Sequence, residues 1–255
     1  MLFMLNGVKK LKKTGRMAII QNGSSLFTGD AGSGSSEIRR YVIESDLVEA
    51  IIQLPTDLFY NTGISTYIWV ITKDKSMERS GKVQLIDASK CFAKRRKNIG
   101  NKRVDLDDKC ISLIMKAYSE FSDKEYSDDN LFVESKVFDN EFFGYTKVTV
   151  LQAIVDDNGN LILKKGKMQQ DKEKGTDTEI IPLSEDIDGY MEKNVLPYSP
   201  NAYLDRSKDR IGYEIPFTRL FYKFVPPMAS EEIFAEIKAL EDEETKLMKE
   251  LFGND

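Results

Sequence analysis

The sequence predicts an α/β fold: the C-terminal half of a doubly wound sheet with a reversed last strand, followed by an α+β extension and a C-terminal helix. A helix, a strand and a second helix alternate first. Two nearly continuous apolar runs follow, at residues 48–54 and 66–72, as in strands covered on both faces. The connection 55–65 is too short for a helical crossover, so these strands should pair antiparallel. We expect three parts, residues 1–90, 91–225 and 226–255.

The first elements are a helix and a short strand. Residues 1–13 place Met1, Leu5, Val8 and Leu11 on one side and lysines elsewhere, which predicts an amphipathic helix. Thr14-Gly15 supplies its end, and the apolar residues 17–20 form a strand that stops at Asn22-Gly23.

A glycine- and serine-rich segment, residues 28–36, comes next. It could be a phosphate-binding loop at a helix N-terminus or a mobile surface loop. The third glycine of a G-x-G-x-x-G fingerprint is replaced by Glu37, which favours the surface loop. Ser36 is expected to cap a helix over 37–45 that turns Ile38, Tyr41 and Val42 inward.

The loop between the two apolar runs, residues 54–66, is the strongest candidate for recognition. It carries the adjacent aromatics Phe59 and Tyr60, with Asn61 and Gly63 shaping the turn. The aromatic rings could plug one end of the sheet, or they could form a stacking platform for a planar ligand or an unpaired base.

A basic stretch follows a predicted strand at residues 83–86. Residues 90–103 hold seven cations, which could contact phosphates or could belong to a solvated linker. The central candidates for DNA backbone contact are Lys94, Arg95, Arg96 and Lys97. Asp105 is expected to cap a helix over 106–121, with Ile111, Ile114, Tyr118 and Phe121 on its buried face.

The rest of the chain predicts a hairpin, a short helix and a long terminal helix. Segments 147–155 and 161–164 flank the turn sequence at 156–160, a strong hairpin signal. A short helix should begin at Ser184, and residues 198–224 show no clear periodicity. Ser230 is expected to cap the terminal helix. Its apolar residues follow a four-three spacing, broken only by Glu244, that is typical of a coiled-coil seam: Ile233, Ile237, Leu240, Leu247 and Leu251. This helix could pack on its own domain or dock on a partner's coiled coil.

Composition excludes several classes of active site. The sequence has no histidine, which removes Ser-His-Asp and Cys-His catalysis and histidine zinc sites. Cys91 and Cys110 lack C-x-x-C spacing, as in a cytoplasmic protein with reduced thiols. No apolar stretch reaches about 18 residues, so no membrane span is expected. The net charge of −5 disfavours nucleic-acid binding through overall charge, and neither a catalytic residue nor a metal ligand can be assigned.

An ordered set of segments resembles the modification (M) subunit of type I restriction-modification systems, which are adenine-specific DNA methyltransferases. The resemblance runs through residues 15–20 (GRMAII), 26–27, 37–40 (EIRR), 54–64 (LPTDLFYNTGI), 143–150 (FGYTKVTV), 192–197 and 212–219 (GYEIPFTR). It implies a Rossmann-like methyltransferase domain with an antiparallel seventh strand. That family binds S-adenosylmethionine through a glycine-rich loop and grips the adenine amino group with a (D/N)-P-P-(F/Y) motif.

Neither of these two motifs occurs here, since Pro226-Pro227 has the wrong flanks. The resemblance therefore implies the C-terminal portion of an M subunit, as a truncated gene or a cloned segment, that binds no cofactor and methylates no DNA by itself. It places Phe59, with Tyr60, against a flipped adenine, a role that fits the need to replace lost base stacking. It also matches the helix at 230–252 to the one that packs on the specificity subunit.

Two functions remain open. The chain could be part of an N6-adenine methyltransferase that contacts DNA in the assembled complex. Alternatively, it could be a non-catalytic module that binds a DNA specificity subunit through its last helix. A half sheet also exposes an apolar edge, which permits a homodimer or strand exchange.

Overall fold

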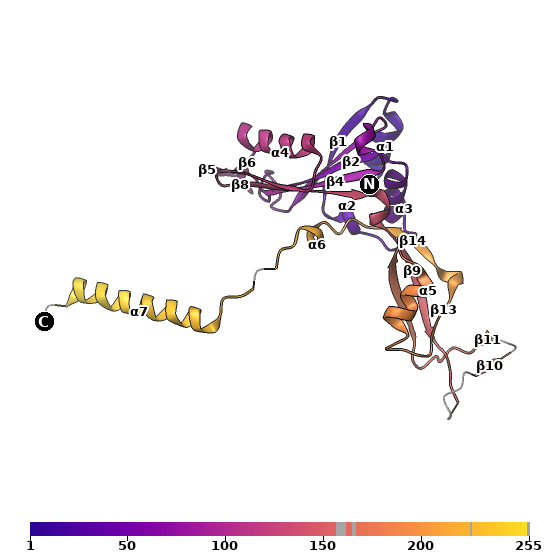
Figure 1. Cartoon of the computed structure of the whole chain (residues 1–255). Helices are drawn as coiled ribbons and strands as arrows, with labels where there is room; N and C mark the ends of the chain where they lie inside the picture. The colour runs from indigo at the N-terminus through magenta and orange to yellow at the C-terminus, as the bar shows by residue number, and fades with distance from the viewer. Residues whose placement is uncertain (157–161, 165–166, 225, 254–255) are drawn as a thin grey trace. The chain divides into compact units, whose positions relative to one another are not determined.

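The computed structural model describes residues 1–156, 162–164, 167–224 and 226–253. These residues form two compact units, Met1–Phe221 and Tyr222–Asp255, and each is described by itself. Figure 1 labels the elements of both.

The first unit is built on a six-stranded mixed sheet with the order β1-β3-β2-β4-β8-β7. Its strands are β1 (Arg16–Asn22), β2 (Val48–Leu54), β3 (Thr66–Thr72), β4 (Lys82–Lys90), β7 (Lys124–Asp128) and β8 (Leu131–Asp139). β3 lies between β1 and β2 and runs antiparallel to both, while β2 and β4 are parallel. β3 is therefore an interior strand of the sheet, flanked by β1 and β2, and β4, β8 and β7 extend the sheet beyond β2.

Helices cover the sheet on both faces, which explains the continuous apolar runs of β2 and β3. One buried cluster joins Met4 and Val8 of α1 (Leu2–Lys10) and Val42 of α3 (Gly34–Glu44) to one face. The other cluster joins Leu113 and Ala117 of α4 (Asp108–Glu120) to the opposite face. Successive residues of a strand point to opposite faces, so both sets must be apolar.

The helix that follows the glycine-rich segment, α3, begins at Gly34, three residues before the predicted start at residue 37. Ser33 is the cap: its side-chain oxygen accepts a hydrogen bond from the Ser36 N–H at 3.4 Å. Ser36 is buried inside the helix, and Tyr41, expected inside, is half exposed. The buried face runs through Ser36, Arg39, Val42 and Ile43, and the Arg39 guanidinium donates hydrogen bonds to backbone carbonyls. Upstream, after the short α2 (Ser24–Phe27), Asp30 forms an ion pair with Lys147 at 2.8 Å.

α4 also differs from the expectation in its cap and its buried face. Asp107, rather than Asp105, accepts a hydrogen bond from the Cys110 N–H at 2.9 Å. Ile111 is half exposed, and the buried face runs through Cys110, Leu113, Ile114 and Ala117. Cys110 and Cys91 are free, buried thiols, and burial raises the pKa of Cys91 to about 12.

A second sheet is centred on β9 (Gly144–Gln152), which pairs antiparallel with three strands. The three are β12 (Thr176–Pro182), β13 (Ala202–Leu204) and β14 (Arg210–Tyr213). The predicted partner of β9, residues 161–164, instead contributes β10 (Leu163–Lys164), which pairs with β11 (Lys167–Met168). The predicted turn lies mostly outside the described residues, although Ile162 N–H donates to the Ile154 carbonyl at 2.9 Å.

Short helices complete this unit. Asp186, rather than Ser184, caps α5 (Ile187–Tyr190), and a π-helical turn continues over Met191–Val195. The segment without periodicity, 198–224, contains β13, β14 and α6 (Phe217–Phe221), each too short to show a repeat.

The second unit is dominated by one helix, α7 (Ser230–Phe252). Ala229 occupies the cap position that we expected for Ser230, and no side chain there caps the helix. Among the described residues, no helix combines the length and apolar character needed to span a membrane.

Candidate functional site

Two segments meet at one edge of the first sheet because β2 and β4 are parallel. Parallel strands place their carboxyl ends at the same edge, where ligands of α/β sheets commonly bind. The aromatic loop 54–66 follows β2. The stretch after β4 forms a hairpin of β5 (Ala93–Ile99) and β6 (Lys102–Asp105), which is labelled near β8 in Figure 1. Apart from Lys90, which ends β4, the basic residues therefore lie on a β-hairpin.

Backbone hydrogen bonds join the hairpin to the aromatic loop. The Arg103 N–H donates to the Asp57 carbonyl at 2.9 Å, and the Asn101 N–H donates to the Tyr60 carbonyl at 3.0 Å. Just before Asn101, Gly100 has φ +59°, and a Cβ there would lie 2.6 Å from the Tyr60 carbonyl oxygen. A side chain at position 100 would therefore push the loop and the hairpin apart.

Lys102 makes the third connection. Its ammonium donates to the Leu58 carbonyl at 3.0 Å and forms an ion pair with Asp105 at 2.8 Å. The same nitrogen lies 5.6 Å from the centre of the Tyr60 ring, within range of a cation–π interaction. The hydrogen bond from Lys102 lowers the pKa of Asp105, so this carboxyl group stays ionised at neutral pH.

The two aromatic residues of the loop differ in exposure. Tyr60 is 57% exposed, whereas Phe59 is half-buried and forms an isolated β-bridge with Thr62. Asn61 and Gly63 are exposed, and a Cβ at Gly63 would lie 2.7 Å from a carboxylate oxygen of Asp57. Tyr60 thus offers a flat ring at the surface, and Phe59 supports the turn beside it.

Some of the predicted cations form ion pairs with carboxylates, and others are exposed to solvent. Arg95 forms an ion pair with Asp105. In the described part of the chain no ion pair is found for Lys94, Arg96 or Lys97, which are exposed. These three face a solvent region where phosphates could approach, together with the exposed Arg103.

Sequence reasoning missed the residues that join these two segments: Asp57, Lys102 and Arg103. One signal was present, since Gly100-Asn101 is a two-residue hairpin turn sequence. The residues on either side of this turn are mostly consecutive basic side chains, so the usual alternation of apolar and polar residues in a strand is absent. Asp57 itself has φ +57°, an uncommon backbone conformation that is often found at functional loops.

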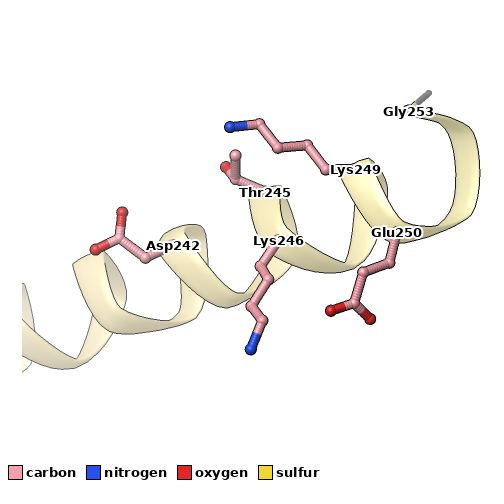
Figure 2. A pocket seen from close by; sticks show the side chains of 6 residues that line it. All are labelled: Asp242, Thr245, Lys246, Lys249, Glu250 and Gly253. Carbon is pink, nitrogen blue, oxygen red and sulfur yellow. The ribbon is translucent and has the colours of Figure 1, made fainter. Parts of the chain in front are cut away.

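The apolar seam of α7 is exposed along its length. Ile233, Ile237, Leu240, Leu247 and Leu251 are between 44% and 74% exposed. Figure 2 shows a hollow along the last turns of this helix, lined by residues from Asp242 to Gly253. All of its lining residues come from one helix and its end, so this hollow leaves any ligand open to solvent on the far side.

No group of three or more potential metal ligands lies together within the described ranges. The side chains that the loop and the hairpin present at this edge are one exposed ring, Tyr60, and several exposed cations.

Comparison with known proteins finds a matching family and several similar relatives. The model of the N-6 DNA methylase family matches residues 1–174. A type I restriction enzyme methylase subunit of Methanocaldococcus jannaschii, MjaVIII, is 37% identical over 112 residues, which are 44% of this chain and 18% of that protein. The HindI methylase subunit of Haemophilus influenzae is 37% identical over 78 residues, 31% of this chain and 17% of that protein. The matched part thus spans less than a fifth of either relative.

Among solved structures, a type I methyltransferase subunit of Streptococcus thermophilus is similar, with 28% identity and a TM-score of 0.46. That match covers 56% of this chain and 27% of the other. The family match extends over more than half of the sequence and includes the aromatic loop and the basic hairpin. The chain belongs to the N-6 DNA methylase family.

Proposed function

We propose that this chain is part of the modification subunit of a type I restriction-modification system, where it helps to methylate adenine N6 in DNA. The observation that carries the proposal is that an exposed aromatic loop lies against a basic hairpin. Hydrogen bonds from Asn101, Lys102 and Arg103 of the hairpin to carbonyls of the loop hold the two together. An adenine must leave the duplex to be methylated, and an aromatic face offsets its lost stacking. Cations on the adjoining hairpin would hold the backbone.

In this proposal β1, β3 and β2 form the antiparallel end of a Rossmann-like methyltransferase sheet. S-adenosylmethionine and the group that polarises the adenine amine would be supplied by residues other than these 255, because the glycine-rich loop and the Pro-Pro-aromatic motif do not occur in this sequence. Within the described residues β1 pairs only with β3, so its other edge can accept a further strand of the sheet or a second copy.

Removal of the aromatic rings tests the base contact. We expect the chain to bind a short duplex with one unpaired adenine more tightly than the fully paired duplex. Tyr60→Ala and Phe59→Ala should each reduce that preference, by about 5- to 100-fold, since stacking contributes roughly 1–3 kcal/mol per base. Fluorescence anisotropy at low salt measures both affinities.

A matched control is Tyr198→Ala, which removes an exposed aromatic ring far along the chain from the loop. Equal affinity of the unaltered protein for the two duplexes would contradict the base contact. An equal loss in the Tyr198 variant would show a general effect of removing surface aromatics.

A second proposed function is docking on a DNA specificity subunit through α7. It is favoured by the exposed apolar seam, which has the spacing of a coiled coil. We expect Leu240→Glu with Leu247→Glu to abolish co-purification with that subunit, because two buried carboxylates would each need desolvation. Glu236→Gln with Glu243→Gln, on polar positions of the same helix, should leave the complex intact. Retention of the complex by the leucine double variant would end this proposal.

A further inference from the structure

A cleft lies between the aromatic loop and the β5–β6 hairpin, distinct from the exposed Tyr60 ring. Its volume is about 340 Å³, at the lower end of the range for small-molecule sites, about 300–1,000 Å³. Thr56 and Asp57 of the loop line one side, and Lys94, Asn98 and Arg103 line the hairpin side. Phe92 contributes a partly buried aromatic wall.

The side chains that line the cleft carry a net positive charge, which favours binding of an anion. Among the described ion pairs, Arg95 is neutralised by Asp105, whereas none involves Lys94 or Arg103. Two cations thus remain against the single carboxylate of Asp57. An arginine fork binds phosphate oxygens through two parallel N–H groups, and an ammonium adds a point charge.

The geometry ties this cleft to the aromatic loop. The Arg103 N–H is hydrogen-bonded to the Asp57 carbonyl, three residues before Tyr60 in the loop. Arg103 also follows Lys102, whose ammonium lies against the Tyr60 ring. One short strand, β6, therefore carries both the residue behind the ring and the cation of the cleft.

We propose that this cleft binds a phosphodiester of the DNA strand that carries the extruded adenine, within a nucleotide of that base. Arg103 and Lys94 hold the phosphate, Asn98 donates to it, and Phe92 packs against the sugar. The inference rests on the proposed function for its choice of strand. Beyond that function, the hairpin contacts the DNA backbone at one defined phosphate and does not merely attract DNA through its overall positive charge.

Replacement of single phosphates by neutral methylphosphonates tests the proposal. The probe is a short duplex with one unpaired adenine, substituted either beside that adenine or four nucleotides away. Substitution beside the adenine should weaken binding about tenfold, the size expected for one charge-assisted hydrogen-bonded contact, and the distant substitution should have little effect. Arg103→Gln should bind the natural duplex about tenfold more weakly and should no longer respond to the neighbouring methylphosphonate.

Lys97→Gln is the matched control, because it removes one exposed hairpin cation that does not line the cleft. This variant should keep its sensitivity to the neighbouring methylphosphonate, and Arg103→Lys should restore part of the affinity. Equal responses at the two positions, or an Arg103→Gln variant that still responds, would overturn the proposal. Unchanged thermal unfolding of each variant would show that the fold is intact.

The outcomes separate this inference from the proposed function. If the duplexes with and without an unpaired adenine bind equally, the base contact fails. The cleft is then tested by NMR titration with deoxyadenosine monophosphate and with deoxyadenosine. Shifts at the amides of Asn98 and Arg103 with the nucleotide alone would support a phosphate site, and no shifts with either would overturn it.

Discussion

Replacement of Arg39 by alanine should lower the free energy of unfolding by about 3–5 kcal/mol, because this cation is fully buried and holds three backbone carbonyls. Its guanidinium donates to Tyr213 O at 2.6 Å, Thr28 O at 2.9 Å and Ser25 O at 3.3 Å. Burial lowers the pKa of Arg39, and its removal would leave these buried carbonyls without the hydrogen bonds that it donates. Urea unfolding monitored by circular dichroism measures the loss.

The neighbouring Arg40 provides the control for Arg39. Among the described residues, Arg40 forms ion pairs with Glu37 and Glu44 of the same helix, and all three side chains are partly exposed. Arg40→Ala should change stability by no more than about 0.5 kcal/mol. Similar losses in both variants would show that α3 depends on helix propensity rather than on the buried contacts of Arg39.

The location of Arg39 also shows what the sequence could and could not predict. Helical periodicity located α3, and continuous apolar runs located β2 and β3, because covered strands need apolar side chains on both faces. It could not place an arginine in the core, since a charged residue there depends on carbonyls from residues 25, 28 and 213. Such contacts between distant parts of the chain leave no local pattern.

The sequence predicted the two segments of the candidate site separately, but it did not show that they lie next to each other. The aromatic loop and the basic stretch each stood out through residue type. Their proximity follows from the parallel pairing of β2 and β4, which brings the ends of the two strands to one edge. That pairing depends on which strand lies beside which, and β3 intervenes between the two along the chain but not in the sheet. Composition alone cannot show such an order.

Replacement of Glu49 by alanine should have an effect as large as that of Arg39, about 3–5 kcal/mol, through a buried ion network. Glu49 is 2% exposed and lies at an irregularity of β2, where the pairing with β3 shifts between residues 48 and 50. Its carboxylate accepts from Arg16 Nε at 2.8 Å and Arg16 Nη2 at 3.2 Å, and it lies 3.7 Å from Arg79 Nε.

Removal of this carboxylate would leave the two arginines in different situations. Arg16 is about half exposed and can be hydrated, whereas Arg79 is buried between the rings of Tyr118 and Phe121. Most of the destabilisation should therefore come from the unpaired charge of Arg79. Glu78→Ala, which removes an exposed carboxylate next to Arg79, is the control and should have little effect in the same urea titration.

A double replacement separates charge from packing. If the loss in Glu49→Ala arises from an uncompensated buried cation, Glu49→Leu with Arg79→Met should be more stable than Glu49→Ala, because both charges are gone and the volume is kept. A double variant as unstable as Glu49→Ala would show that losing the hydrogen bonds of Arg79 with Gln84 and the Tyr118 carbonyl costs as much as leaving its charge unpaired. Those bonds link β4 to the end of α4, so in that case the network would serve to fix the helix on the sheet.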